Sequence, residues 1–104
     1  MSQPNQNASD LAQGPGRLLS RWLDYLTAVR GRARLTRDAY ANAVAGFLGF
    51  MTDHLGAPPD PATLGALRIG DFRAWMAARR RAGLGARALR RDLAAVRGFM
   101  AWIE

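Results

Sequence analysis

The sequence predicts an all-α fold, a compact bundle of four helices, on the strength of three observations. Apolar residues recur at intervals of three and four in four separate stretches, as expected for helices that bury one face. β-Branched residues never cluster, and no apolar–polar alternation extends beyond a few positions, so no strand is indicated. The chain has 104 residues, of which 49% are hydrophobic, which suffices for one domain with one core.

The first predicted helix follows a polar leader. Residues 1–14 contain few apolar side chains and no periodic pattern, so we expect them to be disordered. Pro15 suits the first turn of a helix that extends to about residue 30. Its apolar face consists of Leu19, Trp22, Leu23, Leu26 and Val29. The predicted domain therefore comprises residues 15–104.

The second predicted helix spans residues 36–55. Thr36 suits its N-cap, and Asp38 in the first turn would interact favourably with the helix dipole. Its apolar stripe consists of Tyr40, Val44, Phe47, Leu48, Met51 and Leu55. The opposite face is small or polar. Gly56 is a favourable stop, and the three prolines within residues 57–62 predict a loop.

Two further helices carry most of the basic side chains. The third begins weakly at residues 63–67, strengthens over residues 70–82 and ends before Gly83. The fourth extends from about residue 85 to the end of the chain. Its apolar stripe consists of Leu89, Leu93, Val96, Met100 and Ile103. We expect Leu93 to be a core residue whose truncation to Ala costs about 2–5 kcal/mol. Because this strong pattern has no stop signal, we expect further chain to follow it.

The charge of the chain indicates a polyanionic partner. There are 15 basic and 8 acidic residues, a net charge of +7, and every basic residue is Arg. Seven arginines lie between residues 79 and 97, where the one acid is Asp92. A second basic group consists of Arg30, Arg32, Arg34 and Arg37. Both groups lie near helix N-termini, which favour anions, and the Arg fork suits phosphate and guanine edges. We expect a two-point grip on DNA; a solvated face in an Arg-rich chain is the alternative.

The chain has few side chains that could perform catalysis. It contains no Cys and a single His, and its Ser residues are confined to positions 2, 9 and 20. His54, near the end of the second predicted helix, is expected to be structural or solvated. We therefore expect no catalytic activity, no metal site and no cofactor. Without a signal-peptide core or an apolar run of about 20 residues, a cytoplasmic protein with no membrane partner is expected.

Four segments, in order, resemble the N-terminal core-binding domain of XerC/XerD-type tyrosine recombinases, a SAM-like domain of the phage integrase family. The segments are RWLDYL (21–26), LTRDAYANAVAGFLGFM (35–51), IGDFRAWMAARR (69–80) and RRRAGLGARALRRDLAAVRGFMAWI (79–103). The resemblance covers most of the chain and leans towards the XerC type. It departs from the family at Gly85 and Ala88, where relatives carry Ser or Thr.

The resemblance implies that this domain forms half of a clamp around a recombination half-site in double-stranded DNA. The second and fourth helices of such domains approach the major groove. Neighbouring protomers assemble into a DNA-bound tetramer that serves DNA integration, recombination and chromosome dimer resolution at cell division. The nucleophilic Tyr and an Arg/His/Lys cluster belong to a C-terminal catalytic domain, which we expect to be absent from this chain.

By position, the resemblance assigns DNA binding to two groups of residues. They are Thr36, Arg37, Ala39, Tyr40 and Asn42 on the second helix and Arg87, Arg90, Arg91 and Arg97 on the fourth. The run from Arg79 to Arg81 would contact the DNA backbone or contribute to the general field. Two other functions stay open: a free-standing helical DNA-binding protein, and a SAM-like protein-interaction module without salt-dependent DNA binding. An RNA-binding domain is a weaker alternative, because it would need exposed aromatic residues.

Overall fold

A computed structural model describes residues 14–28 and 34–103 of the chain. These residues form five helices and no strand: α2 (Pro15–Ala28), α3 (Arg34–Leu55), α4 (Pro61–Gly65), α5 (Ile69–Arg81) and α6 (Ala86–Ile103). The predicted all-α class is confirmed: α2, α3, α5 and α6 correspond to the four predicted helices, and the weak helical turn predicted at residues 63–67 is the separate short helix α4. The predicted leader, apart from Gly14, lies outside the described residues. No described helix is long and apolar enough to cross a membrane.

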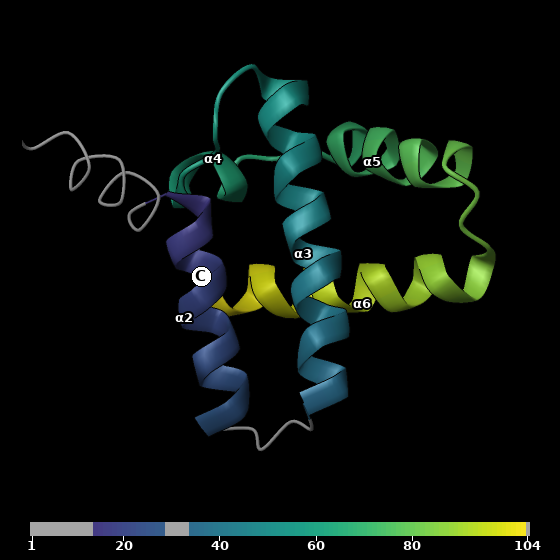
Figure 1. The fold of residues 1–104 in the computed structure, drawn as a ribbon. Coiled ribbons are helices and arrows are strands. Elements are labelled where there is room, and N and C mark those ends of the chain that lie inside the picture. Colours follow the sequence, from purple (N-terminus) through teal and green to yellow (C-terminus); the bar gives the residue numbers. More distant parts are fainter. Residues whose placement is uncertain (1–13, 29–33, 104) are drawn as a thin grey trace, which may run out of the picture.

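The long helix α3 is at the centre of the fold. It contacts α2, α5 and α6, and its contact with α6 is the most extensive between any two described helices. In Figure 1, α2 and α3 lie side by side in opposite directions, and α6 crosses behind α3. Helix α5 extends to the same side of α3 as the N-terminal half of α6. The two helices with the most arginines therefore project together from the α2–α3 pair.

Helix α3 begins two residues earlier than predicted. Thr36 is its third residue, so the prediction that Thr36 is the N-cap is wrong. Asp38 is its fifth residue, and the first turn contains no acid, contrary to the prediction. The residues at 34 and 35 are Arg and Leu, which both favour helices more than Thr does, and this is consistent with the longer helix. Gly56 follows α3 with φ of +87°, as a predicted C-terminal stop should.

Helix α4 begins inside the predicted loop. Asp60 is its N-cap: the carboxylate oxygen Oδ1 accepts a hydrogen bond of 2.8 Å from the backbone N–H of Thr63. This bond holds the pKa of Asp60 below its ordinary value of 3.8. Pro61 is the first helical residue, a position where its missing N–H removes no hydrogen bond. Leu64 is 1% exposed and anchors the connection against the core.

Two aromatic clusters join the helices. The members are Trp22, Tyr40 and Phe99 in the first cluster and Phe47, Phe72 and Trp75 in the second. In the first, the Trp22 ring centroid lies 5.9 Å from that of Tyr40 and 5.5 Å from that of Phe99, which links α2, α3 and α6. In the second, Phe47 of α3 lies 5.8 Å and 5.3 Å from the two rings of α5. Such pairs stabilise beyond the area that they bury.

Candidate nucleic-acid interface

Helix α6 exposes all four of its arginines, each of which the resemblance assigns to DNA binding. They are Arg87, Arg90, Arg91 and Arg97. The Arg91 side chain has a relative exposure of 62%. The opposite side of the helix is buried through Leu89, Val96 and Phe99. The predicted division of this helix into a buried and a basic side is therefore confirmed, while contact with DNA stays a prediction.

These four arginines do not form a single row. Successive residues of an α-helix are rotated by about 100°, so residues four or seven apart share a side. Arg87 and Arg91 form one such pair, and Arg90 and Arg97 form another. Arg90 and Arg97 line grooves that α6 forms with α5, whereas Arg87 and Arg91 do not. Helix α6 thus presents one arginine pair beside α5 and another on a separate side.

The single acid of this basic segment is buried. Asp92 is 4% exposed and lies on the core side of α6. Its Oδ2 accepts a hydrogen bond of 3.0 Å from the Arg79 guanidinium, and its Oδ1 lies 3.8 Å from Nε of Arg91. The sequence pattern contained a signal for this, because Asp92 is three residues after Leu89 and four before Val96, both on the apolar face. The ion pair connects α5 to α6.

Arg79 is consequently engaged within the protein. Its side chain is 34% exposed and its guanidinium faces the buried Asp92 carboxylate. Arg80 and Arg81, the next two residues, are exposed. The predicted role of the whole run in DNA contact therefore does not fit Arg79, because contact with phosphate would leave a buried carboxylate without its partner.

The five candidates on α3 do not share one surface. Asn42 is exposed, whereas Thr36, Arg37, Ala39 and Tyr40 are half-buried. Tyr40 stacks on Trp22, and Thr36, four residues earlier, lies on the same side of the helix. Arg37 lies beside Asp38, with 3.9 Å between the guanidinium and the carboxylate. Tyr40 therefore has a packing role, and Asn42 lies on the opposite side of α3.

The first turn of α3, which contains Arg37, and the α5–α6 turn lie in different parts of the molecule. Arg30 and Arg32, as well as the side chain of Arg34, lie outside the part of the chain that the structure describes. In Figure 1 the first turn of α3 is at the bottom of the view and the α5–α6 turn is at the right. A ligand that contacts Arg37 and the arginines beside the α5–α6 turn must therefore span the molecule.

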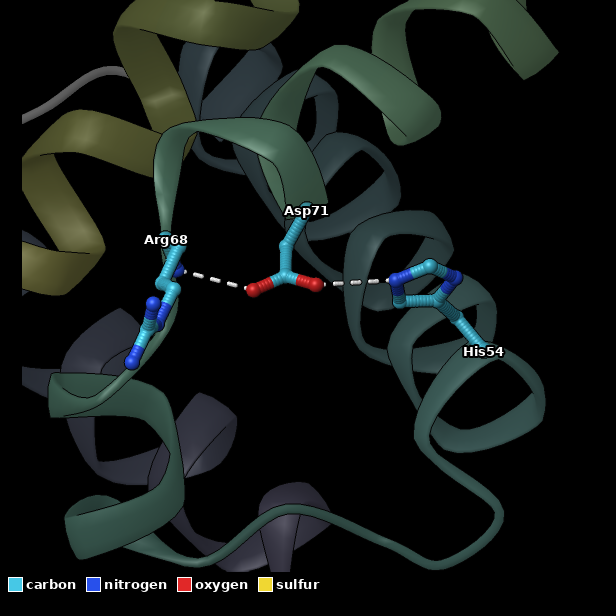
Figure 2. A network of polar contacts seen from close by, with 3 residues as sticks. All are labelled: His54, Arg68 and Asp71. Atoms are coloured by element: carbon cyan, nitrogen blue, oxygen red, sulfur yellow. Dashed lines mark hydrogen bonds and ion pairs between the residues drawn. The ribbon is translucent and has the colours of Figure 1, made fainter.

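His54 joins the end of α3 to the start of α5. Its Nε2 lies 2.9 Å from Oδ1 of Asp71, whose Oδ2 accepts a 2.8 Å hydrogen bond from the backbone N–H of Arg68 (Figure 2). The Arg68 N–H and then His54 hold the pKa of Asp71 below 3.8. The contact agrees with the structural role predicted for His54. Among residues 14–28 and 34–103, no group of three His, Cys, Asp or Glu side chains could hold a metal ion.

Comparison with known proteins places the chain in a family. Residues 19–104 match the family model described as "Phage integrase, N-terminal SAM-like domain". Similar proteins include the tyrosine recombinase XerC of Rhodospirillum centenum, 43% identical over 86 residues, which cover 83% of this chain and 25% of the relative. The tyrosine recombinase XerC of Nitrobacter winogradskyi is 34% identical over 103 residues, 99% of this chain and 32% of the relative.

The XerC of Rhizobium meliloti is likewise 43% identical, over 81% of this chain and 26% of its own length. The chain thus spans about a quarter to a third of the curated relatives described here. No solved structure matches it. The family match covers most of the chain and agrees with the all-helical fold and with the resemblance of the four segments. The chain belongs to the N-terminal SAM-like domain family of phage integrases.

Proposed function

We propose that this chain binds double-stranded DNA as the N-terminal domain of a site-specific tyrosine recombinase and forms half of a clamp around a recombination half-site. The observation that carries this proposal is the exposed arginine surface of α6, a helix whose single acid, Asp92, is buried. The family to which the chain belongs supports the same proposal. The proposed partners are the DNA and other recombinase protomers in a DNA-bound tetramer. The proposed setting is the cytoplasm, in DNA integration, recombination and chromosome dimer resolution.

Electrostatics supports DNA as the ligand. A net charge of +7 on 104 residues favours a polyanion, because each neutralised phosphate releases counterions. Arg87 and Arg91 lie in the first two turns of α6, on one side of the helix. Arg can bind phosphate through two parallel hydrogen bonds, and the backbone N–H groups of a helix N-terminus add to the attraction.

Either α5 or α6 could correspond to the fourth helix, to which the resemblance assigns DNA contact, depending on whether the short α4 is counted among the described helices. The resemblance assigns DNA contact to a second and a fourth helix, and the prediction identified the fourth with residues 85–104. When the short α4 is included, the fourth helix is α5, which exposes Arg73, Arg80 and Arg81. We favour α6, because Arg87 and Arg91 are exposed outside the α5–α6 groove, whereas Arg73 and Arg80 line that groove.

We also propose that this chain does not cleave DNA by itself. The resemblance assigns the nucleophilic Tyr and the Arg/His/Lys cluster to a separate C-terminal domain. The expected result is therefore binding without a covalent protein–DNA adduct on a nicked half-site duplex, as judged by denaturing gel electrophoresis. A tyrosine-linked adduct formed by this chain would contradict this part of the proposal.

Fluorescence anisotropy with a labelled half-site duplex and a scrambled duplex, across a salt series, tests the proposal. Binding should weaken steeply with salt, with a logarithmic slope of about −0.9 per phosphate contact. The double substitution Arg87→Ala/Arg91→Ala should weaken binding and reduce the magnitude of this slope by about 1 for each phosphate-contacting Arg. Arg17→Ala, an exposed position on α2, is the matched control and should bind as the wild type does.

Each outcome has a defined meaning. Preference for the half-site supports the clamp, and salt-sensitive binding without preference supports a DNA-binding domain whose specificity depends on other parts of the recombinase. If Arg73→Ala/Arg80→Ala weakens binding and Arg87→Ala/Arg91→Ala does not, the contact belongs to α5. No binding at low salt would overturn the proposal in favour of a protein-interaction module.

A further inference from the structure

Helices α5 and α6 leave an apolar groove between them. The groove has a volume of about 940 Å³, and its apolar lining includes Met76 from α5 and Leu93 and Met100 from α6. These three side chains are only half-buried. Ile69, at the first turn of α5, also lines the groove and is 68% exposed. Contiguous apolar surface of this kind on a small protein is typical of a binding site.

The charged residues that line this groove all have the same sign. They are Arg73 and Arg80 from α5 and Arg97 from α6, and no Asp or Glu lines the groove. The acid of α6, Asp92, is on the core side of the helix and is paired with Arg79. The groove therefore combines an apolar floor with a positive rim.

We propose that this groove binds an amphipathic helix of another protein, one whose apolar stripe is flanked by acidic side chains. A helix laid in a groove buries apolar residues at positions i, i+3, i+4 and i+7, and the carboxylates beside that stripe would meet the three arginines. DNA fits this groove less well, because the outside of a duplex is lined with phosphates and offers no apolar ridge for Leu93 and Met100. The site shares Arg97 with the predicted DNA-binding residues but is distinct from Arg87 and Arg91, and it goes beyond the proposed DNA binding.

A designed peptide pair tests the proposal with the 104-residue chain. Both peptides form an 18-residue amphipathic helix with a Leu stripe; one carries Glu beside the stripe and the other carries Lys at the same positions. We expect the Glu peptide to bind wild-type protein at least about tenfold more tightly than the Lys peptide, because the rim attracts one and repels the other. Anisotropy of labelled peptide measures the affinity, and a Glu peptide with the Leu stripe scrambled should lose binding.

Charge reversal locates the site. Arg80→Glu should weaken binding of the Glu peptide and strengthen that of the Lys peptide. Arg17→Glu alters the net charge equally but lies on α2, so it should change the two affinities much less, through the altered net charge alone. Circular dichroism of both variants checks their folding. Equal binding of the Glu and Lys peptides by the wild type, equal effects of the two reversals, or undiminished binding of the scrambled peptide would each overturn the proposal. Because the peptide assay contains no DNA, its result does not depend on whether the domain forms a clamp around DNA.

Discussion

The buried Asp92 carboxylate pairs with Arg79 and so removes one arginine from the exposed basic segment. The Asp92 side chain is 5% exposed, whereas the Arg79 side chain is 34% exposed. Taking a carboxylate out of water costs several kcal/mol, and the guanidinium at 3.0 Å offsets much of that cost. The pair holds α5 and α6 together at the point where both helices carry exposed arginines, so it also positions those arginines.

The unequal exposure of the two partners predicts an unequal effect of removing them. Arg79→Met keeps the aliphatic stem but leaves a buried carboxylate without its main partner, and we expect a loss of about 3 kcal/mol, the lower end of the range for such pairs. Asp92→Asn should cost less, because the Asn amide oxygen still accepts a hydrogen bond and Arg79 can reach water. Urea unfolding of both variants measures the difference. A larger loss for Asp92→Asn would contradict this assignment of the buried charge.

The Asp71 carboxylate gives the protein a pH-dependent contribution to stability. Its folded-state pKa is below 3.8, because the Arg68 N–H and His54 stabilise the ionised form. A lowered pKa means that the unfolded state takes up protons first as the pH falls. The contribution is therefore complete well above pH 3.8 and is lost as the pH falls through that value and below it.

Asp71→Asn should consequently lower the stability of the protein at neutral pH and have little effect on it in acid. At pH 7 we expect the variant to have a lower melting temperature than the wild type, since the contact with His54 loses its charged acceptor. As the pH falls through 3.8 and below it the two melting temperatures should converge, because the wild-type carboxylate becomes protonated as the pH approaches its lowered folded-state pKa. Thermal unfolding followed by circular dichroism between pH 7 and pH 3 measures this difference. A difference that stayed constant over this interval would show that Asp71 does not titrate as described.

At the scale of the helix, α6 is rotated slightly from the orientation that its apolar stripe predicts. The stripe predicts burial of Leu89, Leu93 and Met100, but Leu93 and Met100 are only half-buried and line the groove with α5. The core side is centred instead on positions that include Ala95 and Asp92. Leu93, expected to be a core residue, therefore packs against the edge of the core and is not fully buried in it. The neighbouring helices decide which part of a wide apolar stripe is covered.

The same substitution at two positions of α6 tests this orientation. Leu89→Ala removes a side chain that is 6% exposed and should cost about 2–5 kcal/mol. Leu93→Ala removes one that still borders the open groove, so its loss should be clearly smaller, because the removed atoms bury less area and leave no enclosed cavity. Chemical denaturation at constant pH provides both values. Equal losses would mean that the groove is closed in solution.

At the scale of the whole molecule, one core joins elements that are distant in sequence. Trp22 of α2 meets Phe99 of α6, and Phe47 of α3 meets Trp75 of α5. Since α3 carries a member of both aromatic clusters, neither cluster can open without disturbing α3. Arg37 on α3 and the exposed arginines of α5 and α6 are thus held on one framework, which a domain that grips DNA at two points would require.

A shared core predicts cooperative unfolding. Phe47→Ala removes a fully buried ring from the second cluster and should cost about 3–5 kcal/mol. Its unfolding transition, and that of the wild type, should coincide when followed by tryptophan fluorescence and by helical circular dichroism. Separate transitions for the two probes would show that the domain does not unfold in a single cooperative step.

Sequence patterns alone predict the helical class, the long helices to within a few residues at their described ends, and the glycine stops at Gly56 and Gly83. These features depend on local physics: the helical period of apolar residues and the left-handed backbone that glycine adopts easily, with φ of +87° and +97° at these two positions. The sequence also shows the excess of arginine and the order of motifs that agrees with the family match.

The packing of the helices against one another determines which helix sides are covered. It separated Arg79 from the exposed arginines by pairing it with Asp92, placed Tyr40 against Trp22, and left Leu93 beside an open groove. Each of these outcomes depends on which helix lies next to which, and contacts between residues distant in the sequence leave no periodic signal in it. The start of α4 at Pro61 is local, because Asp60 caps it, whereas the burial of Leu64 depends on the core that the other helices build.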